Sequence, residues 1–210
     1  LFERSMPVLY YAVGACSLAP HIVLEWIGAP YEAVRVNYGS PELLAVNPAG
    51  AVPTLREEDG WLLTQAGAIL EYLAHKHPEA DLTGGEGLRE RAEAHRWSAF
   101  LTSDMHAAFW PVFMPDRYTT DQSPEARAAV VAAGKALAAK QFATLDRHLE
   151  GRDWILSRRS VIDAYAFPMI RWGAKLLEGG LGSYPNVARL HDRLAADPAV
   201  QRVLARESAR

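Results

Sequence analysis

The stretch "YYAVGACSLAPHIVLEW", residues 10–26, changes character in its middle. A short apolar run ends at Gly14, and apolar residues then recur at helical spacing up to Trp26. Cys16, the only cysteine of the 210 residues, lies at this change. The pattern predicts a strand followed at once by a helix, with the single thiol at the N-terminus of that helix.

This position has consequences for the thiol. Unpaired amides at a helix N-terminus stabilise a thiolate and lower its pKa, so a reactive cysteine suits this place. A lone cysteine is also often a small buried apolar residue, and this stretch alone leaves both interpretations open. A single cysteine excludes an intrachain disulfide and fits a reducing compartment, so we expect a cytoplasmic protein.

The flanking sequence alternates between strand and helix patterns. Gly28 ends the helix, and Asp59-Gly60 is typical of a hairpin turn. The predicted order is β-α-β, a loop, then β-β-α, with the first two strands parallel because a helix connects them. The other segments are the strands "VLYY" (8–11) and "YEAVRV" (31–36), the hairpin "PTLREEDGWLLT" (53–64) and the helix "QAGAILEYLAHK" (65–76).

The second half of the chain carries no strand pattern. Residues 76–87 are rich in Gly and acidic residues, which is typical of a linker. Ser160 and Asp163 have the spacing of a capping box at the start of one helix. We therefore predict a small α/β domain over residues 6–80 and an all-α domain over 88–210. The helices expected in the latter are 88–113, 123–150, 160–177 and one or two within 184–207.

Charge and hydropathy exclude several classes of partner. The formal net charge of −3 gives no reason to expect nucleic acid or an anionic membrane. No apolar run approaches the roughly 20 residues that span a bilayer. We expect Met6 to be the natural start, with Leu1–Ser5 as an added remnant that lacks the order of a signal peptide. His75 and His77 have no acidic or cysteine cluster at metal spacing, so we expect a solvated pair and no metal.

Two further features of the first half point to a ligand. The Val52–Pro53 bond at the mouth of a strand is predicted to be cis, which would present the Val52 N–H and C=O to a peptide-like ligand. The helix start "TQAG" would offer backbone amides to a carboxylate. Each feature alone is only a turn or a cap, but together with Cys16 they favour a binding site. His21 is expected to be a buried, hydrogen-bonded helix residue.

Five segments occur in order over residues 8–205: "GACSLAPHI", "VNPAGAVPTL", "LLTQAGAILEYL", "HAAFWPVFMP" and "SVIDAYAFPMIRW". With these the chain resembles the glutathione S-transferase superfamily, most closely its bacterial beta class. The resemblance implies a thioredoxin-like N-terminal domain, an all-α C-terminal domain, a homodimer and glutathione as co-substrate. The small apolar residues of "AAVVAAGKALAA" (128–139) fit a two-fold dimer formed by the helices after residue 88.

The resemblance also assigns roles to residues. It implies that Cys16 lies against the glutathione sulfur and forms a mixed disulfide with it, and that His106 faces that sulfur from the helical domain. It further implies two groups of binding residues, although the aromatic ones are equally candidates for plain core. These are Val52, Pro53, Gln65 and Ala66 for glutathione, and Phe109, Trp110, Phe113 and Trp172 for an apolar electrophile.

Several positions depart from the family pattern. Gln65 and Ala66 stand where a Glu and a Ser or Gly are usual, Ala107 replaces a lysine, and Ala99 replaces an asparagine that reaches across the dimer. The losses remove charge-assisted contacts of about 1.5–3 kcal/mol each, which predicts weakened glutathione binding. Two hypotheses follow: a detoxifying glutathione transferase that conjugates an apolar electrophile or exchanges thiols and disulfides, and a non-catalytic regulatory protein that resembles the stringent starvation proteins. Retention of Cys16 and His106 favours the enzyme.

Overall fold

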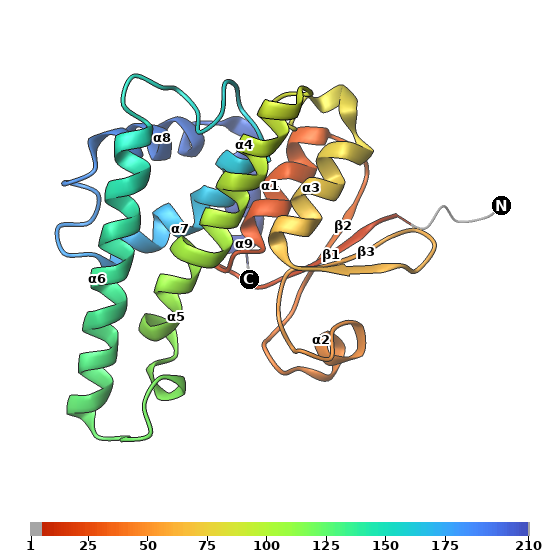
Figure 1. Ribbon diagram of the computed structural model, residues 1–210. Helices are drawn as coiled ribbons and strands as arrows, with labels where there is room; N and C mark the ends of the chain where they lie inside the picture. Colours follow the sequence, from red (N-terminus) through yellow and green to blue (C-terminus); the bar gives the residue numbers. More distant parts are fainter. Residues whose placement is uncertain (1–5, 210) are drawn as a thin grey trace.

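The computed structural model describes residues 6–209, so the expected remnant Leu1–Ser5 lies outside the described residues. A four-stranded sheet of order β2-β1-β3-β4 forms the first part (Figure 1). β1 and β2 are parallel, while β3 is antiparallel to both β1 and β4. The predicted parallel pair and hairpin are therefore confirmed. The strands are β1 (Val8–Tyr11), β2 (Glu32–Arg35), β3 (Thr54–Arg56) and β4 (Leu62–Thr64).

Helices cover both faces of the sheet. Successive residues of a strand point to opposite faces, so Leu9 packs with α1 (Leu18–Ile27) and α3 (Ala66–Lys76), whereas Tyr10 packs toward α2 (Pro41–Val46). α1 ends at Gly28, which adopts a left-handed φ of 74° that suits glycine.

The sequence interpretation missed α2 and expected a loop there. The local signals for this helix were nevertheless present. Ser40 accepts a hydrogen bond from the Leu43 amide at 3.3 Å, and Pro41 occupies the first helical position. At six residues, the helix is too short to show a clear helical period.

The second part consists of helices and connecting loops, with no strand among its described residues. The predicted helix 88–113 is interrupted by a π-helical segment, η2 (Phe100–His106), and the predicted region 184–207 forms two helices. Short 3₁₀ turns, η1 (Pro78–Ala80) and η3 (Pro115–Arg117), lie between longer elements. The α-helices are α4 (Leu88–Ala99), α5 (Ala107–Phe113), α6 (Pro124–His148), α7 (Val161–Leu176), α8 (Pro185–Ala195) and α9 (Pro198–Ser208).

α7 runs through the middle of the molecule and is buried along most of its length. Its start carries the predicted capping box. The fully buried carboxylate of Asp163 accepts hydrogen bonds from the Ser160 amide at 2.8 Å and from the Ile155 amide at 2.9 Å. The capping box is therefore confirmed, and it also fixes the segment that precedes the helix.

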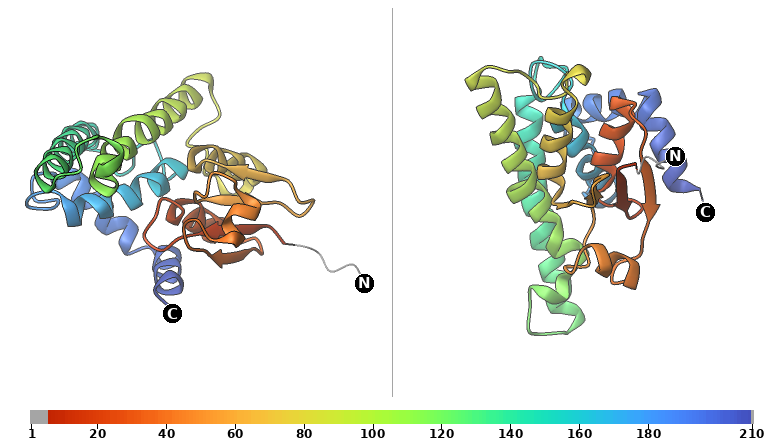
Figure 2. Two further views of the ribbon diagram at one scale, coloured as in Figure 1. Left: turned by 90° about the horizontal axis from the view of Figure 1, so that it is seen from below. Right: turned by 90° about the vertical axis from the view of Figure 1, so that its right-hand side faces the viewer.

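The two parts share one core because α1 packs against both α7 and α9 (Figure 2). His21 Nδ1 lies 2.8 Å from Glu207 Oε1, and both residues are buried at this interface. His21 is thus the buried, hydrogen-bonded residue that was predicted. None of the helices within residues 6–209 combines the length and the apolar character needed to cross a membrane.

Candidate active site

A buried serine fixes the loop that carries Cys16. Ser17 Oγ accepts a hydrogen bond from the Ala12 amide at 3.1 Å and donates one to the Ala12 carbonyl at 3.2 Å. These two bonds tie the end of β1 to the start of α1. Cys16 is partly exposed, and its thiol donates to the Val52 carbonyl at 3.5 Å. The thiol therefore lies against the backbone that the sequence predicts for ligand binding.

The pKa of the Cys16 thiol differs from the sequence expectation. Burial of the sulfur raises the pKa of Cys16 to about 11, although the amides of Cys16 and Ser17 act in the opposite direction. The amides of Leu18 and Ala19 donate to the carbonyls of residues 15 and 16, and Pro20 has no N–H. Few amides are thus free for the sulfur. The predicted low pKa is wrong because desolvation outweighs the helix N-terminus.

The Val52–Pro53 bond is cis, as predicted. The loop before it is stabilised from within by Asn47, whose side chain donates to the Ala51 carbonyl at 2.8 Å and accepts from the Ala49 amide at 3.0 Å. These bonds hold the Val52 backbone beside Cys16.

The start of α3 is open. Gln65 precedes the helix with a φ of 72°, an uncommon conformation for a residue with a side chain, and it makes no side-chain cap. Ala66, the first helical residue, is buried. The first amides of α3 therefore face the site without a capping side chain, which suits an anionic ligand.

A cleft of about 610 Å³ lies between the two parts of the molecule. It brings together Cys16 and His106, the four residues predicted for glutathione, and most of the aromatic residues predicted for an electrophile. Among the residues that line it, Lys175 is the only Lys or Arg, and no Asp or Glu contributes. The predicted residues that line the cleft are Cys16, Val52, Pro53, Gln65, Ala66, His106, Trp110, Phe113 and Trp172.

One predicted pocket residue does not line the cleft. Phe109 has no exposed surface and packs behind the wall, with its ring centroid 5.4 Å from that of Trp172. The prediction that it contacts the electrophile is wrong, because the helical face on which it lies turns into the core. Its role is to support Trp172.

Stacked rings form the wall on the helical side. His106 stacks on Trp110, with centroids 5.4 Å apart and planes 12° apart, and contacts Trp172 at 5.1 Å. The Trp172 indole donates to the Gly14 carbonyl at 2.8 Å, which joins α7 to the Cys16 loop. The two walls are thus fixed to each other directly.

His106 lies at the end of the π-helical segment, and such segments are frequent at functional sites. Burial lowers the pKa of His106 to about 4. The imidazole is therefore neutral at physiological pH, with one N–H donor and one acceptor nitrogen. A neutral donor can stabilise an anion in the cleft without being titrated near pH 7.

Sequence reasoning missed several residues of the cleft. Tyr165 is seven residues before Trp172 and Lys175 is three after it, so all three share a face of α7; this spacing was a usable signal. Thr102 bonds the Tyr165 hydroxyl at 3.1 Å. Tyr38 reaches the cleft from the loop before α2, and no local pattern distinguished it.

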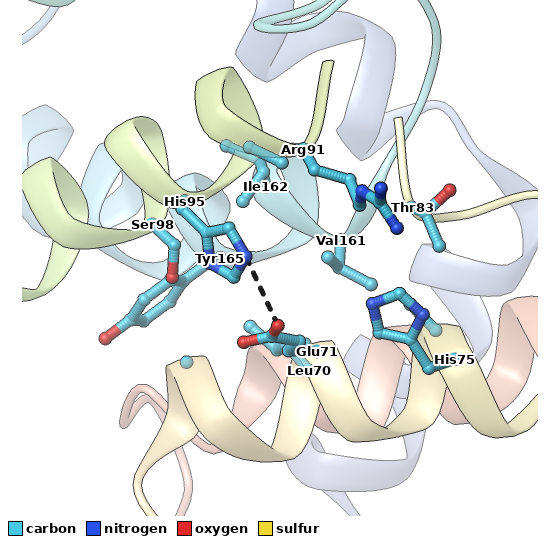
Figure 3. A pocket seen from close by; sticks show the side chains of 13 residues that line it. Leu70, Glu71, His75, Thr83, Arg91, His95, Ser98, Val161, Ile162 and Tyr165 are labelled. Carbon is cyan, nitrogen blue, oxygen red and sulfur yellow. Dashed lines mark ion pairs between the residues drawn. The ribbon is translucent and has the colours of Figure 1, made fainter. Parts of the chain in front are cut away.

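A second cavity lies between α3 and α4, and Figure 3 shows its rim. Glu71 and His95 point toward each other across it at 3.5 Å, and His75 and Arg91 lie farther along. His75 is thus separate from His77, which pairs with Glu79 at 3.1 Å. The cavity measures only about 40 Å³ and contains no cysteine, so the larger cleft is the better candidate for chemistry.

Comparison with known proteins shows which family the chain belongs to. Two family models match: glutathione S-transferase N-terminal domain over residues 13–81, and glutathione S-transferase C-terminal domain over residues 101–198. The glutathione S-transferase GST-4.5 of Xanthomonas campestris pv. campestris is 38% identical over 95% of this chain and 98% of its own length. The chain belongs to the glutathione S-transferase family.

Two solved structures resemble this glutathione S-transferase over nearly its whole length. A bacterial beta class glutathione S-transferase of Sphingomonas chungbukensis is 34% identical, covers 96% of this chain and 98% of its own, and has a TM-score of 0.84. A sphingomonad glutathione S-transferase complexed with glutathione is 34% identical, covers 97% and 100%, and also has a TM-score of 0.84. These comparisons confirm the fold class and the resemblance to the beta class.

Proposed function

We propose that this glutathione S-transferase conjugates glutathione to an apolar electrophile in the cleft between its two domains. The observation that carries the proposal is the meeting of Cys16, His106 and the Val52 backbone with an aromatic wall in one cavity. The glutathione bound to a structural relative supports the same co-substrate. A metal is not required by this chemistry.

The tripeptide would bind mainly through backbone groups. Its γ-glutamyl carboxylate would lie on the first amides of α3, and the Gln65 side chain would accept from its α-amino group. Its cysteinyl main chain would pair with Val52 beside the cis Pro53. The expected affinity is lower than in relatives that place charged side chains at these positions.

The thiolate would be stabilised by two neutral donors. The raised pKa of Cys16 keeps its S–H protonated, and the lowered pKa of His106 keeps its imidazole neutral. Both groups can donate to the glutathione sulfur, which loses its proton to solvent. The sulfur then attacks the electrophilic carbon, a C–S bond forms, and the leaving group departs with its electron pair.

Calorimetry and a conjugation assay test this function. We expect heat of binding at millimolar glutathione, and glutathione-dependent conjugation of 1-chloro-2,4-dinitrobenzene with release of chloride. The matched control is S-methylglutathione, which has no thiol and is expected to bind without reacting. Absence of both heat and conjugation would rule out the proposal and favour a non-catalytic protein on the same fold.

We further propose a homodimer with a detoxifying role in the cytoplasm. Leu88 at the start of α4 is 79% exposed and Leu137 on α6 is 50% exposed, so within residues 6–209 both helices carry exposed apolar side chains that a second copy could cover. Reducing conditions would keep both glutathione and Cys16 as thiols. Sedimentation velocity at micromolar concentration is expected to give a dimer, and a monomer there would contradict this assembly.

A further inference from the structure

The cleft is lined by one positively charged side chain and by no negatively charged one, among the residues that the structure describes. The lining holds no carboxylate, His106 is neutral, and Lys175 supplies the one formal charge among the lining residues that the structure describes. The whole chain carries a net charge of −3, so the positive cleft is a local property. Lys175 lines the cleft and is exposed, so its ammonium group attracts anions through a field that solvent partly screens.

Lys175 stands on the electrophile side of the cleft. It lies one turn after Trp172 on α7 and directly before Leu176, which also lines the cleft. The glutathione residues proposed above belong to the opposite wall, which is built from the N-terminal domain. Within residues 6–209, Lys175 forms no ion pair with a carboxylate. The side chain therefore has no structural partner to hold it.

The shape of this wall limits what fits beside the ammonium group. Trp110, Phe113 and Trp172 offer flat apolar surface, and Lys175 lines the same cleft three residues after Trp172. A ligand that uses both features has an aromatic or similarly apolar body with an anionic group at its edge. A purely apolar ligand would leave the ammonium group without a counter-charge.

We propose that the electrophile of this transferase is an aromatic or apolar carboxylate, and that Lys175 selects it by pairing with the carboxylate. This inference rests on the proposed conjugation. The chemical step is unchanged: the glutathione sulfur forms the C–S bond, the leaving group departs with its electron pair, and the thiol proton goes to solvent. Lys175 takes no part in bond making and acts as a specificity residue.

Two matched electrophiles test the proposal. 4-Chloro-3-nitrobenzoate and 4-chloro-3-nitrobenzamide have the same ring and leaving group and differ in charge. Each kcat/KM is divided by the uncatalysed rate with glutathione, which removes the difference in intrinsic reactivity. We expect the native protein to prefer the carboxylate about tenfold, and Lys175→Met to remove most of this preference. Lys175→Glu is expected to reverse it, because it places two negative charges together.

A control variant and the contrary outcomes separate this inference from the proposed function. Lys140→Met on α6, outside the cleft, changes the same charge and is expected to leave the preference in place. If both substrates are conjugated but Lys175→Met leaves their ratio unchanged, the inference is wrong and conjugation stands. If neither substrate is conjugated while 1-chloro-2,4-dinitrobenzene is, the inference is wrong and conjugation stands. If 1-chloro-2,4-dinitrobenzene is not conjugated either, the proposed function fails first. A loss of stability without a change of ratio would assign Lys175 to the C-terminus of α7 instead.

Discussion

Two helix starts of this molecule carry an ionisable side chain, Asp163 at α7 and Cys16 at α1. The two differ in burial and in hydrogen bonding. At the start of α7, Asp163 is fully buried and accepts from two backbone amides. At the start of α1, the Ser17 side chain does not cap the helix, and Cys16 lines the cleft. At the first helix start the buried Asp163 carboxylate accepts from backbone amides, whereas at the second few amides are free and Cys16 lines the cleft.

The difference shows how burial acts on two ionisable groups. Burial raises the pKa of Asp163 to about 6 and that of Cys16 to about 11. The aspartate still serves the fold, because two amides and a hydroxyl donate to it. The thiol serves as a donor, because it stays protonated. A helix N-terminus alone therefore decides neither charge nor function, and the packing around it does.

The largest expected effect concerns the start of α7. Asp163→Ala leaves the buried amides of Ile155 and Ser160 without an acceptor, which costs about 4 kcal/mol of the free energy of unfolding. Urea denaturation monitored by circular dichroism measures the loss. Asp197→Ala is the matched control, because this N-cap of α9 is partly exposed and its loss costs only about 1 kcal/mol. Equal losses for both variants would show that burial of the cap is unimportant.

The next effect is the pH dependence of the same cap. Since the folded pKa of Asp163 is raised, the folded state binds this proton more tightly than the unfolded state does. The stability that this group contributes therefore falls as pH rises from about 4 to 6, by up to about 3 kcal/mol. Denaturation of the native protein and of Asp163→Asn at pH 4, 5, 6 and 7 isolates the contribution. A native advantage over the variant that grows with pH would contradict the raised pKa.

At the start of α1, the raised pKa of Cys16 predicts a thiol that is unreactive near neutral pH. The thiolate fraction of Cys16 at pH 7 is expected to be about 100-fold below that of an ordinary thiol. Glutathione disulfide should therefore form its adduct slowly at pH 7 and about tenfold faster with each pH unit up to 10, as read from intact-protein mass. The urea-unfolded chain is the control and should react at the ordinary rate. Fast modification of the folded protein at pH 7 would restore the thiolate hypothesis and thiol–disulfide exchange with it.

The smallest expected effect concerns His106. His106→Ala removes one donor to the glutathione sulfur and is expected to lower kcat about tenfold. Since the pKa of His106 is lowered to about 4, the native pH–rate profile should show no inflection between pH 6 and 7. The control is His191→Ala on α8, away from the cleft, which should leave kcat unchanged. An inflection near pH 6.5 that His106→Ala abolishes would show that the imidazole titrates during catalysis.

The sequence predicted those features that short patterns determine. The capping box, the cis Val52–Pro53 bond and the hairpin at Asp59-Gly60 each depend on a few neighbouring residues, and each is confirmed. The short helix α2 was missed, because six residues show no clear period and its cap resembles a turn.

The site was harder to predict because its chemistry depends on residues far apart in the chain. Cys16 and His106 were identified, but their pKa values follow from walls that two domains build together. Phe109 and Trp110 are adjacent in sequence, yet Phe109 is buried in the core and Trp110 lines the cleft, so only the packing of α5 separates the two. Lys175 could have been found from its spacing of three residues from Trp172, which the resemblance had already assigned to the pocket.

The π-helical segment η2 also bears on how this site arose. Its hydrogen bonds reach one residue farther than those of an α-helix, so it holds an extra residue within an otherwise α-helical rod. Successive α-helical residues are about 100° apart around the axis, and one residue more or less rotates everything that follows by that angle. The wider π turn absorbs that rotation, so His106 and Trp110 face the cleft as they would in an α-helix one residue shorter. A descendant that lost one residue between Phe100 and His106 would therefore return to a regular α-helix with its imidazole still toward the cleft, and would lose only the local widening of the helix.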